Sequence, residues 1–168
     1  MMANRKRMVI GAALLACLAG EVAARQINLP SRAPIVGIDV PAAWKTSPTA
    51  RGVEVRSPDE EVFFWLETYR PADEAAVRKE HVDYFAKQGV TPAGDPRVSR
   101  YEEGAMKVQA TDLPATWQGK PTVLRYLAID AGLPDGRMVL LSYWASPEGD
   151  RQHEAAFKAV LNSLGAPK

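Results

Sequence analysis

The sequence has little cysteine or histidine and carries no familiar catalytic motif. Its single cysteine, Cys17, and its two histidines, His81 and His153, are too few and too widely spaced for a disulfide framework or a common zinc motif. Glycine-rich phosphate-binding loops and the Gly-x-Ser-x-Gly elbow are also missing. We therefore predict no catalytic residue, no metal ligand and no cofactor, and we expect a protein that is not an enzyme.

An excess of charge of either sign is absent as well. The 168 residues carry 21 basic and 20 acidic side chains, and removal of residues 1–24 would leave 18 and 19. Proteins that bind nucleic acids usually show a basic patch or excess. The balance indicates no nucleic-acid partner. A content of 46% hydrophobic and 24% charged residues is typical of one globular domain with a real core.

No apolar run is long enough for an ordinary membrane span, but a shorter run follows a basic N-terminus. Arg5-Lys6-Arg7 precedes the apolar residues 8–20, and Val22-Ala23-Ala24 offers the small residues that a signal peptidase reads. This tripartite pattern is typical of a secretory signal peptide over residues 1–24. We expect an exported protein of the periplasm.

A competing cleavage site lies inside the leader. Leu14-Leu15-Ala16-Cys17 resembles the bacterial lipobox, in which the cysteine is lipidated and becomes the mature N-terminus. In that case the signal peptide spans residues 1–16, Cys17 is the lipid attachment site, and the protein is a membrane-anchored lipoprotein. The sequence leaves both cuts open. Residues 25–34 are polar and contain proline, so we expect them to form a flexible tether.

The folded domain, residues 35–165, is organised around residues 122–164. Residues 137–146 are apolar at both side-chain parities, which predicts a strand covered on both faces. Val62–Tyr69 begins with the same two-sided pattern. Residues 150–164 place apolar side chains at i, i+3, i+4 and i+7, which predicts a covering helix.

The other elements are predicted from shorter patterns. One-sided strands are expected at 36–40, 53–55 and 105–113, a hairpin arm at 98–101, a long strand at 122–130, and a helix at 71–89. His81 lies on the apolar stripe of that helix, where it is expected to be a buried residue of the core edge. Trp117 falls in a predicted loop over 113–121 and is a possible ligand or partner contact.

The predicted order is three strands, a helix, four strands and a helix, with Val36–Trp44 at one end and Phe157–Leu164 at the other. This order resembles the PsbP-like fold, which is shared by the photosystem II extrinsic protein, the yeast Ran-binding Mog protein and bacterial DcrB-type periplasmic lipoproteins. The resemblance implies an α+β fold, a three-layer α/β/α sandwich around a central, mainly antiparallel sheet. It also implies no catalysis, and it assigns no functional residue.

These observations favour a non-enzymatic, exported envelope protein, a monomer that acts as an interaction or assembly module for an unidentified envelope protein partner. The alternative is a periplasmic carrier of a small apolar or aromatic ligand. Its pocket would lie between the sheet and a helix, lined by Trp65, Tyr84, Trp117 and Tyr126.

Overall fold

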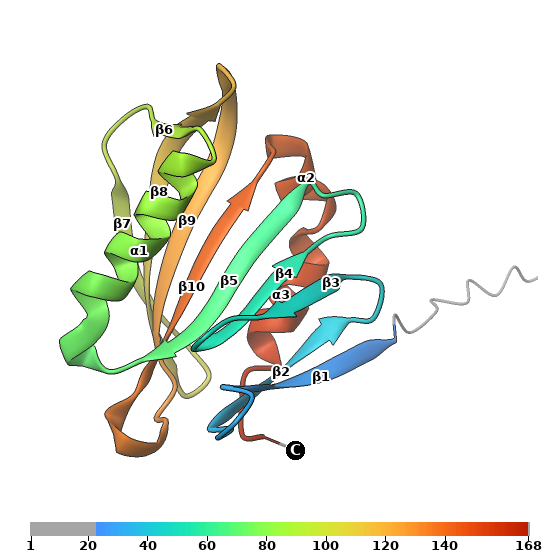
Figure 1. The fold of residues 1–168 in the computed structure, drawn as a ribbon, viewed down its shortest axis with the longest axis vertical. Coiled ribbons are helices and arrows are strands. Elements are labelled where there is room, and N and C mark those ends of the chain that lie inside the picture. Colours follow the sequence, from blue (N-terminus) through green and yellow to red (C-terminus); the bar gives the residue numbers. More distant parts are fainter. Residues whose placement is uncertain (1–22, 168) are drawn as a thin grey trace, which may run out of the picture.

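The computed structural model describes residues 23–167 and is dominated by one large antiparallel sheet (Figure 1). Seven strands follow one another in the order β3-β4-β5-β10-β9-β8-β6, and β7 pairs with β8 beside them. The strands are β3 (Lys45–Pro48), β4 (Gly52–Arg56), β5 (Val62–Tyr69), β6 (Val90–Pro92), β7 (Arg97–Glu103), β8 (Met106–Trp117), β9 (Lys120–Asp130) and β10 (Met138–Ala145).

The centre of the sheet is the pair β5–β10, as the two-sided apolar patterns predict. Leu141 lies opposite Leu66 on β5 and opposite Leu127 on β9. Leu140 and Leu141 point to opposite faces of β10, and both are fully buried. Both faces of the sheet are therefore covered, and the placement of this strand at the centre is confirmed.

Helix α1 (Glu74–Lys87) covers one face of the sheet. It follows a 3-10 turn at Pro71–Asp73 and ends before Gly89, whose φ of 85° suits a residue without a Cβ. Its buried side chains are Val77, His81 and Phe85. The expected burial of His81 is confirmed, since its exposed fraction is 0%.

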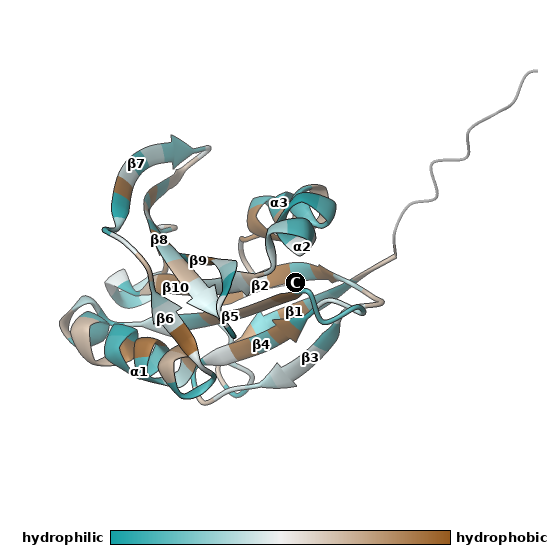
Figure 2. Cartoon of the chain, turned by 90° about the horizontal axis from the view of Figure 1, so that it is seen from above, coloured by the Kyte–Doolittle hydropathy of each residue, from teal (hydrophilic) through white to brown (hydrophobic). Residues whose placement is uncertain are grey.

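The opposite face is covered by α2 (Pro147–Gln152), α3 (Glu154–Asn162) and a separate two-stranded sheet (Figure 2). That small sheet pairs β1 (Ala24–Leu29) with β2 (Val36–Pro41), and its apolar side chains join those of α3 in the main core cluster. The fold is α+β with an antiparallel sheet, as predicted. The predicted three-layer α/β/α sandwich describes the molecule only in part, because the β1–β2 sheet covers the same face as α2 and α3.

The structure differs from the predicted tether at residues 25–29, which belong to β1. Ile27 and Leu29 alternate with Asn28, and Leu29 is only 1% exposed, because β1 lies antiparallel to β2 along six residue pairs. Four residues of alternating apolar and polar side chains next to a proline predict a strand only weakly. The chain pairs here because β2 offers a complete ladder of hydrogen bonds.

The predicted loop over 113–121 is also wrong. β8 continues through Trp117, and β9 begins at Lys120. The two residues between them, Gln118 and Gly119, have φ values of 51° and 74°, which is the pattern of a tight two-residue hairpin turn. Trp117 therefore ends a strand.

The last predicted helix, 150–164, is broken in two at His153. α2 starts earlier than predicted, because the Ser146 hydroxyl accepts a hydrogen bond from the Gly149 amide at 2.9 Å and caps the helix. A Cβ at Gly149 would lie 2.6 Å from the Cβ of Glu61. Only glycine allows α2 to approach the start of β5 this closely.

Candidate docking groove

A groove runs between α3 and the arm of the sheet formed by β7, β8 and β9. Its volume is about 580 Å³. Figure 2 shows β7 and β8 curling away from the rest of the sheet on the same side as α2 and α3, so that the two form facing walls. The floor and lower walls are apolar and include Met106, Val108, Leu127, Ile129, Phe157 and Leu161.

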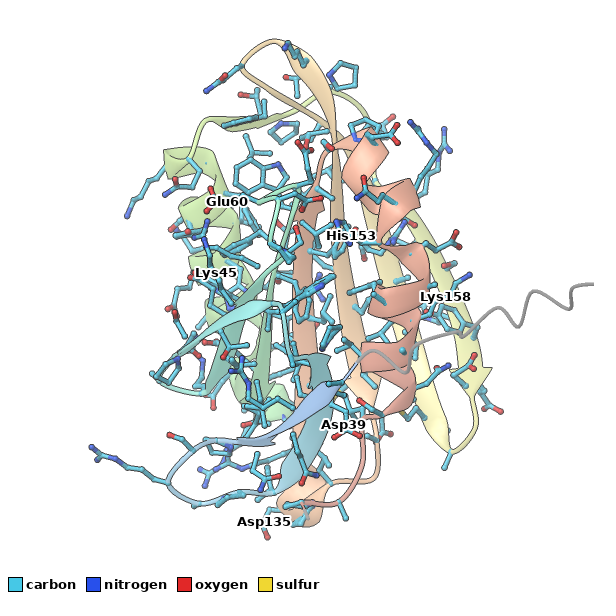
Figure 3. All side chains as sticks on the ribbon, turned by 90° about the vertical axis from the view of Figure 1, so that its right-hand side faces the viewer. Asp39, Lys45, Glu60, Asp135, His153 and Lys158 are labelled. Carbon is cyan, nitrogen blue, oxygen red and sulfur yellow. The ribbon has the colours of Figure 1, made fainter. Side chains whose placement is uncertain are left out.

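The lengths of the strands create this groove. β8 has 12 residues and β9 has 11, whereas the central strands β5 and β10 have eight each. β7 pairs with the first part of β8, and all seven of its residues are exposed. The arm therefore extends beyond the core. Figure 3 shows Lys158 on the side of α3 that faces this arm.

One end of the groove carries a charged cluster around Arg125. Its guanidinium donates to Asp112 at 2.6 Å, and its other branch lies 3.8 Å from Asp150. The same guanidinium lies 5.7 Å from the ring centre of Tyr143, which is fully buried beneath it. Burial and the nearby carboxylate of Asp150 raise the pKa of Tyr143, so this phenol stays neutral at physiological pH.

The rim of the groove holds two more ion pairs along the helices. Lys158 pairs with Glu154 at 2.6 Å, and Arg151 pairs with Glu148 one turn earlier. Their side chains are well exposed, so each pair contributes little stability. The groove thus combines an apolar floor with a charged, solvated rim, which is the usual composition of a surface that binds another molecule.

A second polar cluster is buried under α1. His81 Nδ1 lies 2.7 Å from Ser142 Oγ, and His81 Nε2 lies 3.1 Å from a Glu67 carboxylate oxygen. Arg51 lies 2.7 Å from the same carboxylate. Burial alone would raise the pKa of Glu67, but hydrogen bonds from His81 and Thr49, together with the charges of His81 and Arg51, hold it below its ordinary value.

Serine, histidine and glutamate in one chain of hydrogen bonds resemble a hydrolytic triad, but the placement excludes that role. Ser142 and His81 are fully buried, and Glu67 is 3% exposed. A nucleophile must reach its substrate, and no surface of Ser142 is open. The cluster joins α1 to β5 and β10, so we assign it to the stability of the fold.

A third cluster holds the break between α2 and α3 against the turn after β4. His153 Nε2 lies 2.8 Å from Asp59, and Ser57 donates to the same carboxylate at 2.5 Å. These hydrogen bonds, first that of Ser57 and then that of His153, lower the pKa of Asp59 to about 2. The ring of His153 also meets Trp44 edge-on at 5.3 Å. Trp44 is 5% exposed and closes this end of the core.

The residues singled out from the sequence lie away from the groove. Trp117 is 38% exposed, donates its indole N–H to the Gln88 carbonyl at 3.0 Å, and meets Trp144 at 5.3 Å. Its role as a ligand or partner contact stays a prediction. Cys17 lies outside the described residues. Between 23 and 167, no three His, Cys, Asp or Glu side chains come together as a metal site.

Three of the four aromatic residues proposed for a carrier pocket, Trp65, Tyr84 and Tyr126, belong to the aromatic cluster under α1. Trp65 meets Tyr84 at 4.4 Å, and Phe85 lies 6.3 Å from Tyr126, which is 4% exposed. None of the four proposed residues lines the groove. The groove therefore lies on the opposite face of the sheet from these aromatic residues.

The sequence did not reveal the residues that do line the groove. Only Arg125 could have been noticed, because it points to the same face of its strand as the buried, apolar Leu127 and Ile129. A cation on an inward face needs a partner or access to water. Its partners, Asp112 and Asp150, are distant in sequence and give no local signal.

The comparisons with solved structures bear on the fold. CyanoP, the cyanobacterial PsbP of Synechocystis sp. PCC 6803, superposes with a TM-score of 0.58 at 9% identity, over 94% of this chain and 99% of that one. The chain has a PsbP-like fold. LpqN, a Mycobacterium tuberculosis protein involved in cell envelope biogenesis, superposes with a TM-score of 0.54 at 13% identity, over 86% of this chain and 92% of that one.

The Ran-binding protein Mog1p of Saccharomyces cerevisiae gives a TM-score of 0.51 at 7% identity, over 86% of this chain and 96% of that one. At such identities the likeness shows the fold alone. The sequence itself matches no protein-family model and no curated protein. The PsbP-like resemblance inferred from element order is confirmed, even though the order missed β1, β3 and β6.

Proposed function

We propose that this PsbP-like domain is a non-enzymatic, exported envelope protein that acts as an interaction or assembly module and docks its partner in the groove. The observation that carries the proposal is the groove itself. It leaves about 580 Å³ open above an apolar floor, between α3 and the arm formed by β7, β8 and β9. Apolar surface rimmed by polar residues is typical of protein interaction sites.

An exposed aromatic side chain also favours the groove as the interaction surface. Tyr101 lines the groove and is 44% exposed, although large aromatic side chains usually bury most of their area. Exposed tyrosines are common contact residues in interfaces, because their rings bury area with little loss of conformational entropy. The cluster of Ser142, His81 and Glu67 is closed to substrates by its burial, which supports a function without catalysis.

Export and anchoring are part of the proposal. Signal peptidase cleavage after Ala24 would leave residues 25–29 of β1 in place, and Arg25 would keep its hydrogen bonds to Trp44 and Thr46. Lipidation at Cys17 would instead hold the domain at a membrane through a short segment before β1. Among residues 23–167 no helix is long and apolar enough to cross a bilayer.

Photocrosslinking in intact cells of the source organism tests the docking site. A benzoylphenylalanine at Ser99, which lines the groove, should crosslink to one recurrent partner. Tyr101→Ala should reduce that product severalfold. The matched control is Val82→Ala on α1, because Val82 is 43% exposed and lies far from the groove in the fold. Equal yields from both variants would contradict the proposed docking site.

The carrier function retains one favourable observation, which is the size of the groove. About 580 Å³ falls within the range of small-ligand pockets. Native mass spectrometry of protein purified from its own host distinguishes the two functions. A carrier should retain the mass of a bound small molecule, and Tyr101→Ala should lose it, whereas an interaction module should show the mass of the polypeptide alone.

A further inference from the structure

β7 is an edge strand whose outer side pairs with no other strand among residues 23–167. Edge strands present unpaired N–H and C=O groups that can pair with another chain. The neighbouring edge strand, β6, covers only the far end of β8 and contains Pro92, which cannot donate. The opposite edge of the sheet, β3, has four residues and ends in Pro48. β7, with seven residues and no proline, is the open edge.

The register shows which backbone groups of β7 are free. The Pro114 carbonyl accepts from the Ala93 amide, so residue 114 of β8 directs its polar backbone groups away from β9. The β8–β9 register continues from 107 to 117 without a bulge, so residues 106, 108, 110 and 112 point the same way, toward β7. Their partners on β7 are residues 103, 101, 99 and 97. The intervening residues, Val98, Arg100 and Glu102, direct their N–H and C=O groups outward.

A strand added to this edge would extend the wall of the groove that β7 forms. Ser99, Tyr101 and Glu103 are the β7 side chains that line it. Side chains of an added strand on the same face would continue that row and contact the ring of Tyr101. The opposite row of side chains would face solvent. The groove therefore selects apolar residues at alternate positions.

The charges of the groove add a second requirement. Four carboxylates and three cationic groups line it, and each cationic group is already paired with a carboxylate. The lining therefore holds one more carboxylate than cationic groups, and Glu103 is the carboxylate that takes no part in these ion pairs. Opposite charges in facing positions of neighbouring strands are stabilising. Among the carboxylates that line the groove, Glu103 is the one that lies on β7 itself.

We infer that the partner contributes an extended, basic segment that pairs with β7 as an added strand, with alternate apolar side chains in the groove. This inference rests on the proposed function and names the chemistry of its partner. Seven residues of β7 would accommodate a segment of about seven residues, or roughly 23 Å at 3.3 Å per residue. Main-chain hydrogen bonds supply affinity in this mode of recognition, and the groove supplies selectivity.

The register gives a clean test of backbone pairing. Arg100→Pro removes an outward N–H without removing a hydrogen bond to β8, whereas Arg100→Ala removes the same side chain and keeps the N–H. The probe is a displayed library of random segments of about ten residues, selected against the full chain. Selected segments should alternate apolar residues and carry lysine or arginine. Arg100→Pro should weaken their binding by at least about tenfold relative to Arg100→Ala.

A second pair of variants controls for a folding defect caused by Arg100→Pro. Glu102→Pro and Glu102→Ala should repeat the difference, and all four variants should keep the wild-type circular dichroism spectrum. Selected segments that bind each proline variant as tightly as its alanine counterpart would overturn strand addition, as would a library that yields no binder. If the Ser99 photocrosslink persisted in Arg100→Pro, the groove would remain the docking site and only the inference would fail.

Discussion

Replacing Glu67 by glutamine should lower the free energy of unfolding by about 2–3 kcal/mol at neutral pH. The carboxylate is 4% exposed and accepts from His81 at 3.1 Å while pairing with Arg51 at 2.7 Å. Hydrogen bonds to charged groups contribute about 1.5–3 kcal/mol, and breaking a buried ion pair costs about 3–5 kcal/mol. Arg51 is 31% exposed and also pairs with Glu80, so its charge stays compensated, and we expect a loss toward the lower end.

The pH dependence of this loss has a definite sign. Burial opposes ionisation of Glu67, but the hydrogen bonds from His81 and Thr49 and the positive charges nearby outweigh it and lower its pKa. A folded-state pKa below the unfolded value of about 4.3 stabilises the fold above that value, and the stabilisation is lost as the pH falls through the folded pKa. Glu67→Gln cannot titrate. The gap between wild type and variant should therefore be widest above about pH 5 and should narrow below about pH 4.

Urea denaturation at several pH values measures this gap. The control is Glu80→Gln, which removes a 58% exposed partner of the same Arg51 and should cost less than about 1 kcal/mol. If the two variants shifted the urea midpoint equally at neutral pH, the buried network would not carry the stability that we assign to it. A gap that stayed constant down to about pH 3 would contradict the lowered pKa.

Three further outcomes are expected. Leu141→Ala should lower the free energy of unfolding by about 2–5 kcal/mol, because its side chain is fully buried, whereas Glu103→Ala at the exposed end of β7 should cost little; equal denaturant midpoints would contradict the central place of β10. Asp59 should stabilise the folded protein above about pH 4, and this stabilisation should be lost as the pH falls toward the Asp59 pKa of about 2. Asp59→Asn lacks this contribution, so its thermal midpoint should fall less than that of wild type over the same pH range. Cys17→Ala should leave processing and solubility unchanged if the ordinary signal peptidase acts, and should release a membrane-bound wild type if the lipobox is used; unprocessed cytoplasmic protein in both cases would contradict export.

The sequence predicted the centre of the fold well because burial on both faces leaves a local pattern. Residues 62–69 and 137–146 are apolar at both parities, and they became adjacent central strands within a residue of the predicted ends. The helix over 71–89 was marked by its own proline, acidic first turn and terminal glycine. Each of these patterns is contained within the element that it predicts.

The groove could not be predicted in the same way, because it is built from separate segments. Asp112 and Asp150 meet at Arg125 only after β8, β9 and α2 have been placed. β1 was missed for a related reason. Its pattern is short, and its partner strand supplies the hydrogen bonds that decide its conformation. The close approach of α2 to the start of β5 depends on Gly149 fitting against Glu61, which is a contact between distant parts of the chain.

The exposed arm has a consequence for the dynamics of the domain. β7 is open to solvent on both faces, since a second hollow lies on the side of the arm that faces α1. Its ladder with β8 is thus held with little buried apolar area, and such elements open locally at far lower free energy than the global unfolding of the core. The amides of β7 that bond to β8 should exchange with deuterium well before those of β10. An occupant that completed the sheet would merge this arm into the cooperative unit of the core and slow that exchange.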